Sequence, residues 1–444
     1  MANTSNFLKT VFQNLKSENS KNTLFVPLLL VLLSIPLSYA VNSISLGVLV
    51  ITSLIVFKKE HFSLQPNLLV PLLLYFLMAL SFFWSIDQKS TLAALSKEVP
   101  LLLIPLVFLI NKDFFEQQKQ KIIQYYSYGI LVFTVFYFIK ALVRYSIVQD
   151  SSVFFYHELV TKDVNAIHVS VYVSVAFFYF FRKTTKSFFD YIALALLLAM
   201  VFLLSSKNII VVFIGLILVH YLFLTKVSQR MRMRNLVFFV VFLFSLTFIG
   251  KIRDRFLVEY ETNMADSTVN DVISKGNNKV YNVSIKQAWT NKTFQPNDYF
   301  PGTAFRVYQF RIFTELIVEN NVLFTGFGLN ASHLKIEEKA IQYNLFMGSE
   351  EQDGYQNKNF HNQYVQNFAE LGIFGFLLLL IMLFINVKNA FKSKDFVHFA
   401  FAFLMISLFL TESFLWRQRG VVFFTVMYCL FNSATAKNNS KTNT

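Results

Sequence analysis

The chain has 444 residues, of which 55% are hydrophobic and only 15% are charged, and its formal net charge is +14. A soluble domain of this size needs far more charge to cover its surface, so the composition excludes an ordinary soluble protein. The apolar residues come in long runs, as in transmembrane helices, and the basic residues lie in short clusters between them, which argues against a nucleic-acid partner. The single cysteine, Cys429, excludes a disulfide framework and a cysteine-based metal site.

The N-terminal segment, residues 1–21, is polar and is followed by no small-residue cleavage site, so we interpret it as a cytoplasmic tail. Beyond it, the apolar runs predict twelve transmembrane helices, since a bilayer crossing needs about 20 apolar residues. The predicted spans are residues 24–41, 44–57, 67–86, 98–110, 122–148, 166–181, 189–205, 208–224, 235–250, 366–387, 396–411 and 419–433. The second and fourth are short, and the fourth contains Pro100 and Pro105.

One long hydrophilic stretch, residues 251–360, interrupts this series and holds twelve basic and thirteen acidic residues. Nine predicted helices precede this stretch, so a cytoplasmic N-terminus places the stretch on the outer side of the membrane. Twenty basic residues then flank the inner ends of the helices and six lie in the short outer loops, as the positive-inside rule requires. We therefore predict an all-α polytopic membrane protein, with helices 1–9 in residues 1–250, a large outer loop in 251–360, helices 10–12 in 361–433 and a cytoplasmic tail in 434–444.

The segment FHNQYVQNFAELGIFGFLLLL, which begins at Phe360, carries the most informative pattern. His361 and Asn362 lie where the outer loop returns to the membrane, and Gly372 and Gly375 open the next apolar run. An imidazole at this boundary is well suited to take a hydroxyl proton near neutral pH. The alternative is an interfacial histidine that caps the start of a helix.

The pattern of His and Asn, nine further residues, Gly, two residues and a second Gly resembles the signature of the O-antigen ligase family. The plan of twelve helices with a large loop between the ninth and the tenth resembles this family too. The stretch RVYQFRIFTELIVENNVLFTGFGLN from Arg306, with Gly326 and Gly328, is similar to the family's arginine-containing helix and aromatic-Gly-x-Gly turn. Ser205, Ser206 and Lys207 stand at the family's Ser-Arg motif, where lysine keeps the charge but loses the bidentate geometry. The segment TESFLWRQRG from Thr411 resembles the last outer turn in related chains.

The resemblance implies a membrane glycosyltransferase of GT-C-like architecture in the bacterial inner membrane. Such an enzyme transfers a glycan from an undecaprenyl-diphosphate carrier to an acceptor on the periplasmic side, commonly lipid A-core, so lipopolysaccharide biosynthesis is the implied process. On this basis His361 is expected to be the general base and Asn362 to orient the ring or the substrate. We expect inversion at the anomeric carbon and no cofactor.

The diphosphate leaving group needs its developing charge stabilised by a metal or by fixed cations. The sequence has no Asp-x-Asp pair, and the acidic run at Glu350, Glu351 and Asp353 is typical of a solvated loop, so we expect no metal. The outer-face cations are Arg306, Arg311, Lys207, Arg144, Arg417 and Arg419.

Arg306 is our principal candidate for the diphosphate, with Lys207, Arg311, Arg417 and Arg419 as further substrate-binding candidates. On a helix, Arg311 would pair with Glu315 four residues on, whereas no carboxylate lies at that offset from Arg306. The five-residue separation turns the two arginines about 140° apart, so they are not expected to face one ligand. Lys207, Arg417 and Arg419 are equally compatible with interfacial anchoring.

Three alternatives remain open. An O-antigen polymerase often shows arginine, ten residues and glycine, but the eleventh positions after Arg306, Arg311 and Arg417 are Ile317, Val322 and Tyr428. A protein O-oligosaccharyltransferase shares the ligase-like plan. A transporter or flippase is typically built with charges at mid-membrane, and the predicted spans here are nearly free of them.

Overall fold

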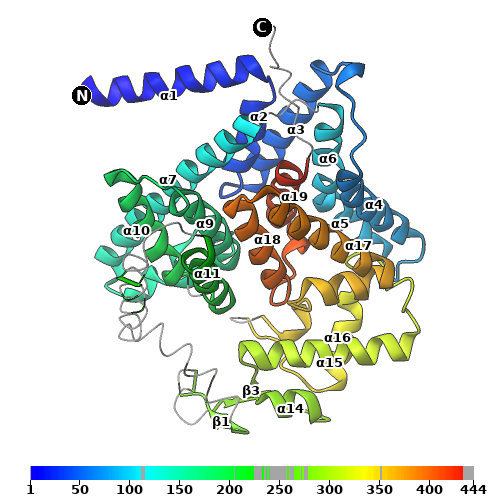
Figure 1. The fold of residues 1–444 in the computed structure, drawn as a ribbon. Helices are drawn as coiled ribbons and strands as arrows, with labels where there is room; N and C mark the ends of the chain where they lie inside the picture. Colours follow the sequence, from blue (N-terminus) through cyan, green and yellow to red (C-terminus); the bar gives the residue numbers. More distant parts are fainter. Residues whose placement is uncertain are drawn as a thin grey trace.

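The computed structural model describes residues 2–111, 116–204, 206–224, 265–271, 273–274, 279–350 and 353–433, together with positions 233, 234, 237, 240, 257 and 260. Helices pack into a bundle that carries α1 (Ala2–Lys21) at one end and the elements of residues 268–342 at the other (Figure 1). The predicted ninth span, residues 235–250, lies almost entirely outside the described residues.

The first two predicted spans are wrong in their boundaries. Helix α1 (Ala2–Lys21) precedes α2 (Phe25–Leu33), and α3 (Tyr39–Ile55) begins inside the predicted first span. Pro36 explains the break, because proline disfavours helical backbone at the residue before it and lacks an amide hydrogen. The Ser38 hydroxyl then accepts the Val41 amide and caps α3. With nine residues, α2 is only about 13 Å long, too short to cross a bilayer alone.

The remaining described spans agree with the predicted ones to within three residues, with three exceptions. The fourth starts at Gln88 instead of residue 98, the fifth starts at Gln117 instead of residue 122, and the tenth ends at Ser393 instead of residue 387. The helices are α4 (Pro66–Leu80), α5 (Gln88–Glu98), α6 (Pro100–Ile110), α7 (Glu116–Val148), α9 (Ala166–Phe181), α10 (Phe188–Leu203), α11 (Lys207–Val219), α17 (Gln363–Ser393), α18 (Phe396–Phe409) and α19 (Gln418–Asn432). Short helical turns join them: η1 (Lys59–His61), η2 (Ser81–Phe83), η3 (Ser151–Phe154), α8 (Tyr156–Leu159), η4 (His220–Leu224), η5 (Tyr355–Asn357) and η6 (Phe414–Trp416).

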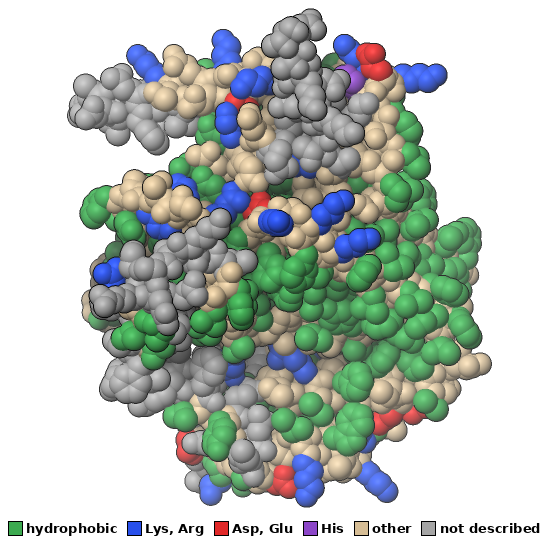
Figure 2. Space-filling view, viewed as in Figure 1, with side chains coloured by type: hydrophobic (Ala, Val, Ile, Leu, Met, Phe, Trp, Pro, Cys, Tyr) green, Lys and Arg blue, Asp and Glu red, His purple; other side chains and the backbone are tan. Residues whose placement is uncertain are grey.

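Among the described residues, four helical stretches are long and apolar enough to cross a membrane: Pro66–Phe83, Gln88–Ile110, Gln117–Val148 and Gln363–Ser393. Five shorter apolar helices accompany them, and large aliphatic side chains such as Ile51 and Ile55 on α3 stay exposed. Figure 2 shows hydrophobic side chains gathered in a band over the middle of one face, with charged side chains above and below this band. The chain is therefore an all-α membrane protein, while the number twelve stays a prediction.

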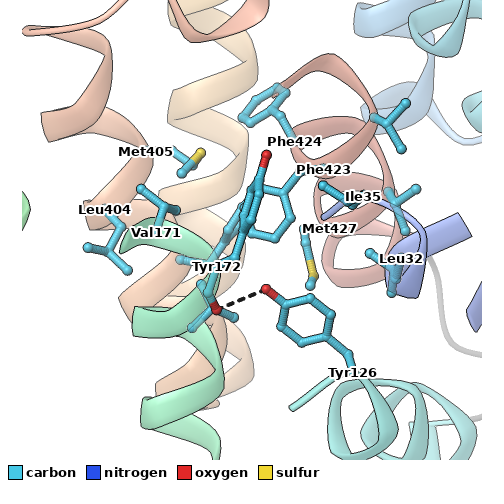
Figure 3. Packing of buried hydrophobic residues seen from close by; sticks show 14 of the residues in the cluster. Leu32, Ile35, Tyr126, Val171, Tyr172, Leu404, Met405, Phe423, Phe424 and Met427 are labelled. Atoms are coloured by element: carbon cyan, nitrogen blue, oxygen red, sulfur yellow. Dashed lines mark hydrogen bonds between the residues drawn. The ribbon is translucent and has the colours of Figure 1, made fainter. Parts of the chain in front are cut away.

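Aromatic side chains fill the centre of the bundle. The Tyr126 hydroxyl donates to the Tyr172 carbonyl at 2.9 Å, and the ring of Tyr172 lies 4.6 Å from that of Phe423 (Figure 3). This contact joins α7, α9 and α19, which are far apart in the sequence. Because lipid removes most of the hydrophobic driving force between helices, close packing and such hydrogen bonds must hold them together.

The part of the predicted outer loop from residue 279 onward has a hydrophobic core of its own, which includes Phe294, Tyr308, Ile336 and Phe360. It is built from α14 (Ile285–Thr290), α15 (Gly302–Asn320) and α16 (Ser332–Gln342). Strand β1 (Thr268–Val269) pairs antiparallel with β2 (Tyr281–Asn282), which pairs parallel with β3 (Asp298–Tyr299). The loop is thus a folded cap rather than a linker.

Candidate functional site

His361 lies in a tight turn immediately before α17. Its φ of +46° is left-handed, and its amide donates to Asn359 Oδ1 at 3.0 Å. A non-glycine residue in this region of φ/ψ space carries strain that the surroundings must hold, which is frequent at functional sites. Asn362 begins the helix, because its Oδ1 accepts the amides of Tyr364 and Val365. The capping role that the sequence allowed for His361 therefore falls to Asn362.

Glu412, in the turn between α18 and α19, faces the imidazole of His361. Its Oε2 lies 3.6 Å from His361 Nδ1, and its side chain is only 6% exposed. Burial alone would raise the pKa of the Glu412 carboxyl, but the facing His361, together with the charges of His168 and Arg306, lowers that pKa to about 2. The carboxylate is therefore ionised at neutral pH and can hold the Nδ1–H tautomer, which leaves Nε2 as the acceptor.

Arg306, on the first turns of α15, approaches the same turn from the outer loop. Its Nε and Nη2 donate to the Thr411 carbonyl at 3.0 and 2.7 Å, and its Nη1 donates to the Gly302 carbonyl at 2.8 Å. No described carboxylate lies within ion-pairing distance of Arg306. The neighbouring Phe305 ring lies 5.6 Å from the His361 ring, so α15 places Arg306 close to the turn that holds His361.

Gly372, the first glycine of the motif, allows the FTGFG turn to pack closely against α17. Gly372 interrupts α17 with φ +64° and ψ −163°, so that residues 363–371 form a separate half-helix behind His361. The FTGFG turn docks on this break: the amides of Phe327 and Gly328 donate to the carbonyls of Ala369 and Glu370, and the Ile373 amide donates to Leu323. A Cβ on Gly372 would lie 2.2 Å from the Phe324 carbonyl oxygen. The spacing from Asn362 to Gly372 is thus the length of the half-helix.

Gly372→Ala is accordingly expected to lower the stability of the protein by about 2 kcal/mol or more, since alanine meets both the left-handed φ and the Phe324 carbonyl. Thermal unfolding of the purified protein in nanodiscs measures the change. Gly47→Ala, on α3, is the matched control because a Cβ there meets nothing within 4 Å. Equal melting temperatures for the two variants would contradict the docking argument.

Two further cations flank the turn. Arg417 is exposed, and no hydrogen bond or ion pair joins its side chain to another described residue. Lys207 is the first residue of α11, next to Asn208, whose amide donates to Thr411 Oγ1 at 2.8 Å. The predicted Ser-Arg position is therefore close to the carbonyl that binds Arg306, although Ser205 lies outside the described residues.

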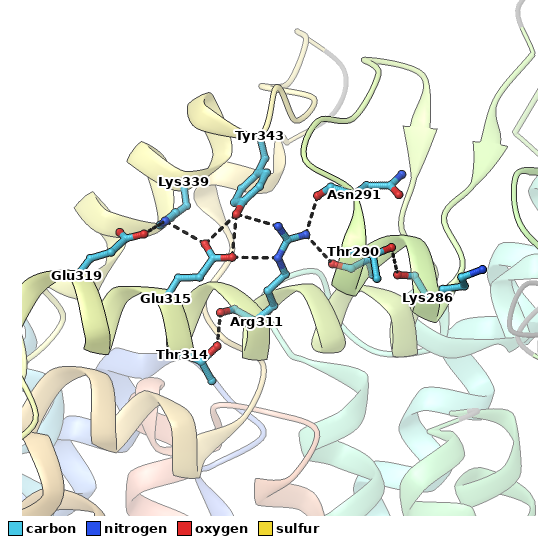
Figure 4. A network of polar contacts seen from close by, with 10 residues as sticks. Lys286, Thr290, Asn291, Arg311, Thr314, Glu315, Glu319, Lys339 and Tyr343 are labelled. Carbon is cyan, nitrogen blue, oxygen red and sulfur yellow. Dashed lines mark hydrogen bonds and ion pairs between the residues drawn. The ribbon is translucent and has the colours of Figure 1, made fainter.

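Arg311 takes no part in this group. It forms the expected ion pair with Glu315 at 2.9 Å and also donates to the Asn291 carbonyl and the Tyr343 hydroxyl (Figure 4). The same Glu315 binds Lys339 at 2.9 Å. These contacts tie α15 to α14 and α16, so the geometry assigns Arg311 to the structure of the cap rather than to a substrate.

Arg419 likewise acts within the fold. It is 5% exposed, it donates to the carbonyls of Asp163 and Leu37, and its guanidinium carbon lies 4.1 Å from the centre of the Tyr39 ring. It therefore joins the segments that precede α3 and α9 to the start of α19 and offers little surface to a ligand.

The acidic groups fall into two kinds. Glu370 is buried near the end of the half-helix that follows His361 and accepts hydrogen bonds from Gln366 and Ser332. Asp353 is 78% exposed and lies 3.7 Å from Lys358, as expected for a solvated run, while Glu351 lies outside the described residues. In the parts of the chain that the structure covers, no group of three or more His, Cys, Asp or Glu side chains could hold a metal.

The sequence analysis did not identify Glu412. The only available signal was its position: it is the one carboxylate between two apolar runs in the TESFLW turn. Its partner, His361, is 51 positions away in the sequence, so no helical or strand spacing links the two residues.

Residues 192–380 match the O-antigen ligase family, and this region contains Lys207, Arg306, His361, Gly372 and Gly375. No curated protein matches the chain. The match supports a membrane enzyme of the glycan-transferring ligase and polymerase type. It supports the resemblance seen in the motifs: residues 192–380, a little under half of the chain, are similar to the O-antigen ligase family.

Proposed function

We propose that this protein is a glycan ligase that transfers a polysaccharide from an undecaprenyl-diphosphate carrier to lipid A-core, or to a similar acceptor, on the periplasmic face of the bacterial inner membrane. The observation that carries the proposal is the His361–Glu412 pair beside Arg306. The site combines a base, a buried carboxylate that orients it and cations for an anionic leaving group. This combination suits transfer to a hydroxyl better than it suits transport.

In the proposed reaction, His361 Nε2 takes the proton of the acceptor hydroxyl as the hydroxyl oxygen attacks the anomeric carbon of the donor. The bond from that carbon to the diphosphate oxygen breaks, and the diphosphate leaves with the electron pair. Attack opposite the leaving group inverts the anomeric carbon and needs no covalent enzyme intermediate. Glu412 stabilises the imidazolium that forms, as a carboxylate does in other histidine dyads.

The diphosphate is assigned to Arg306 and the exposed Arg417, with Lys207 as a helper. Arg306 binds the backbone carbonyls of Thr411 and Gly302 rather than a carboxylate, so no ion pair neutralises its charge. Fixed cations of this kind stabilise developing negative charge without a metal.

The proposed orientation has both termini in the cytoplasm and residues 251–360 in the periplasm. It is supported by contacts between predicted inner segments, such as the Arg182–Asp395 ion pair at 2.7 Å and the bond from Lys119 to the Ser433 carbonyl. Reporter fusions at Lys292, which is exposed in the loop, and at the C-terminus are expected to report opposite sides. Both reporters on the same side would overturn the orientation.

Glycan analysis of a deletion strain tests the function. We expect long-chain glycan to disappear from lipid A-core while polymerised glycan stays on the carrier. Loss of the polymer itself would identify a polymerase, and loss of glycan from proteins alone would identify a protein O-oligosaccharyltransferase.

A further inference from the structure

The outer loop contains an open cleft of about 590 Å³ that none of the proposed catalytic residues lines. It lies between the β2–β3 pair and the segment around Tyr355. Its lining includes four aromatic residues, Tyr281, Tyr299, Phe346 and Tyr355. This volume is typical of small-molecule sites, which are commonly apolar and aromatic with a few placed polar groups.

The polar residues of the cleft are Asn297, Asp298 and Lys279. A sugar ring has a face of C–H groups, which packs on an aromatic ring, and an edge of hydroxyl groups, which amides and carboxylates bind. The mixture of aromatic rings with one amide, one carboxylate and one ammonium group fits a saccharide. A lipid would need a continuous apolar lining, and a polyanion would need more positive charge.

The walls of the cleft are held by backbone bonds. The Tyr281 amide donates to the Asn297 carbonyl at 3.1 Å within the β2–β3 pair. On the other wall, the Tyr355 amide donates to the Phe346 carbonyl at 3.0 Å, and the Tyr355 hydroxyl accepts the Phe300 amide at 3.0 Å. A ligand therefore meets a largely formed surface, which reduces the entropy lost on binding.

The cleft is connected to the proposed catalytic base through two ring contacts. Tyr355, which lines the cleft, lies 5.2 Å from the ring of Phe305, and Phe305 lies 5.6 Å from the ring of His361. In Figure 1, β1 and β3 lie at the end of the molecule away from α1, beyond α15. A glycan whose reacting end is at His361 and whose chain extends away from the membrane would reach the cleft.

We propose that this cleft is a saccharide-binding subsite that holds sugar units distant from the bond being formed. The inference rests on the proposed glycan transfer. Contacts with remote parts of a substrate contribute to binding without touching the reacting atoms, so the cleft governs KM and the choice of glycan rather than the chemical step.

The test compares Tyr281→Ala and Asn297→Ala with the wild-type enzyme in nanodiscs, using carrier-linked glycan as donor and lipid A-core as acceptor. Losing one aromatic contact is expected to raise KM about five-fold with kcat unchanged. Trp289→Ala is the matched control, because Trp289 is an exposed aromatic residue of the same loop that does not line the cleft. A rise in the KM of the donor assigns the subsite to the carrier-linked glycan, and a rise in the KM of lipid A-core assigns it to the acceptor.

Calorimetric binding of the polysaccharide released from the carrier by mild acid gives a readout that does not need turnover. Wild-type protein and the His361→Ala variant are expected to bind it equally, and Tyr281→Ala more weakly. If Tyr281→Ala and Asn297→Ala match the wild type in KM and in binding, the subsite is overturned while the proposed function stands. If the wild-type enzyme transfers no glycan, the proposed function fails, and the binding comparison still decides the subsite.

Discussion

His361→Ala is expected to reduce glycan transfer about 10²–10⁴-fold, because the acceptor hydroxyl loses the base that takes its proton. The loss should appear in kcat, while the carrier-linked glycan still binds, since Arg306 and Arg417 remain. Initial rates of the purified enzyme with carrier-linked donor measure the effect. His333→Ala is the control, because His333 is exposed and binds the Asn330 carbonyl in a different part of the loop. A stably folded His361→Ala protein that transfers glycan at the wild-type rate would eliminate the base role.

The Glu412→Gln variant keeps the His361 imidazole but removes the carboxylate that orients it, so it measures the contribution of that orientation to catalysis. The pKa of Glu412 is about 2, below the value of an unfolded glutamate, so its pairing stabilises the folded site at neutral pH and is lost only as the pH falls toward 2. Substitution is therefore the practical way to remove the charge. We expect a loss of kcat that is smaller than in His361→Ala, because the imidazole is still present but no carboxylate orients it. An unchanged kcat would reduce Glu412 to a structural residue.

Arg306→Ala is expected to reduce transfer about 10²–10³-fold, the usual cost of removing one donor that stabilises a developing anion. Arg306→Lys keeps the charge but loses the fork that a guanidinium presents to phosphate, so it should recover only part of the rate. Inhibition by the product carrier diphosphate is a second measurement. It should weaken in Arg306→Ala and stay unchanged in Glu412→Gln.

Two arginines serve as controls for Arg306. Arg144 is a partly exposed cation paired with Glu158 at 2.6 Å, so Arg144→Ala should transfer at close to the wild-type rate. Arg311→Ala should lower the melting temperature, because it breaks the network around Glu315, but should affect the turnover of folded enzyme little. If Arg311→Ala abolishes transfer while Arg306→Ala does not, the two arginines have been assigned to the wrong faces of α15.

Transfer that stops in EDTA would show that a metal neutralises the diphosphate.

The sequence by itself determined the properties that depend on near neighbours in the chain. Long apolar runs predicted most of the described helices, because a bilayer selects them by length and composition. The i to i+4 rule predicted the Arg311–Glu315 pair, and helix geometry predicted that Arg306 and Arg311 face different partners. The spacing of His361, Asn362, Gly372 and Gly375 indicated the family.

The tertiary structure decided which distant residues meet. Glu412 faces His361 only because the turn after α18 packs beside the start of α17. Buried Arg419 binds the carbonyls of Leu37 and Asp163, partners that no local pattern connects to it. Gly372 has left-handed backbone because the FTGFG turn docks there, which is a contact between segments about 45 residues apart. Periodicity describes one element at a time, whereas a catalytic site is assembled from several, so its geometry follows from the packing of the whole chain.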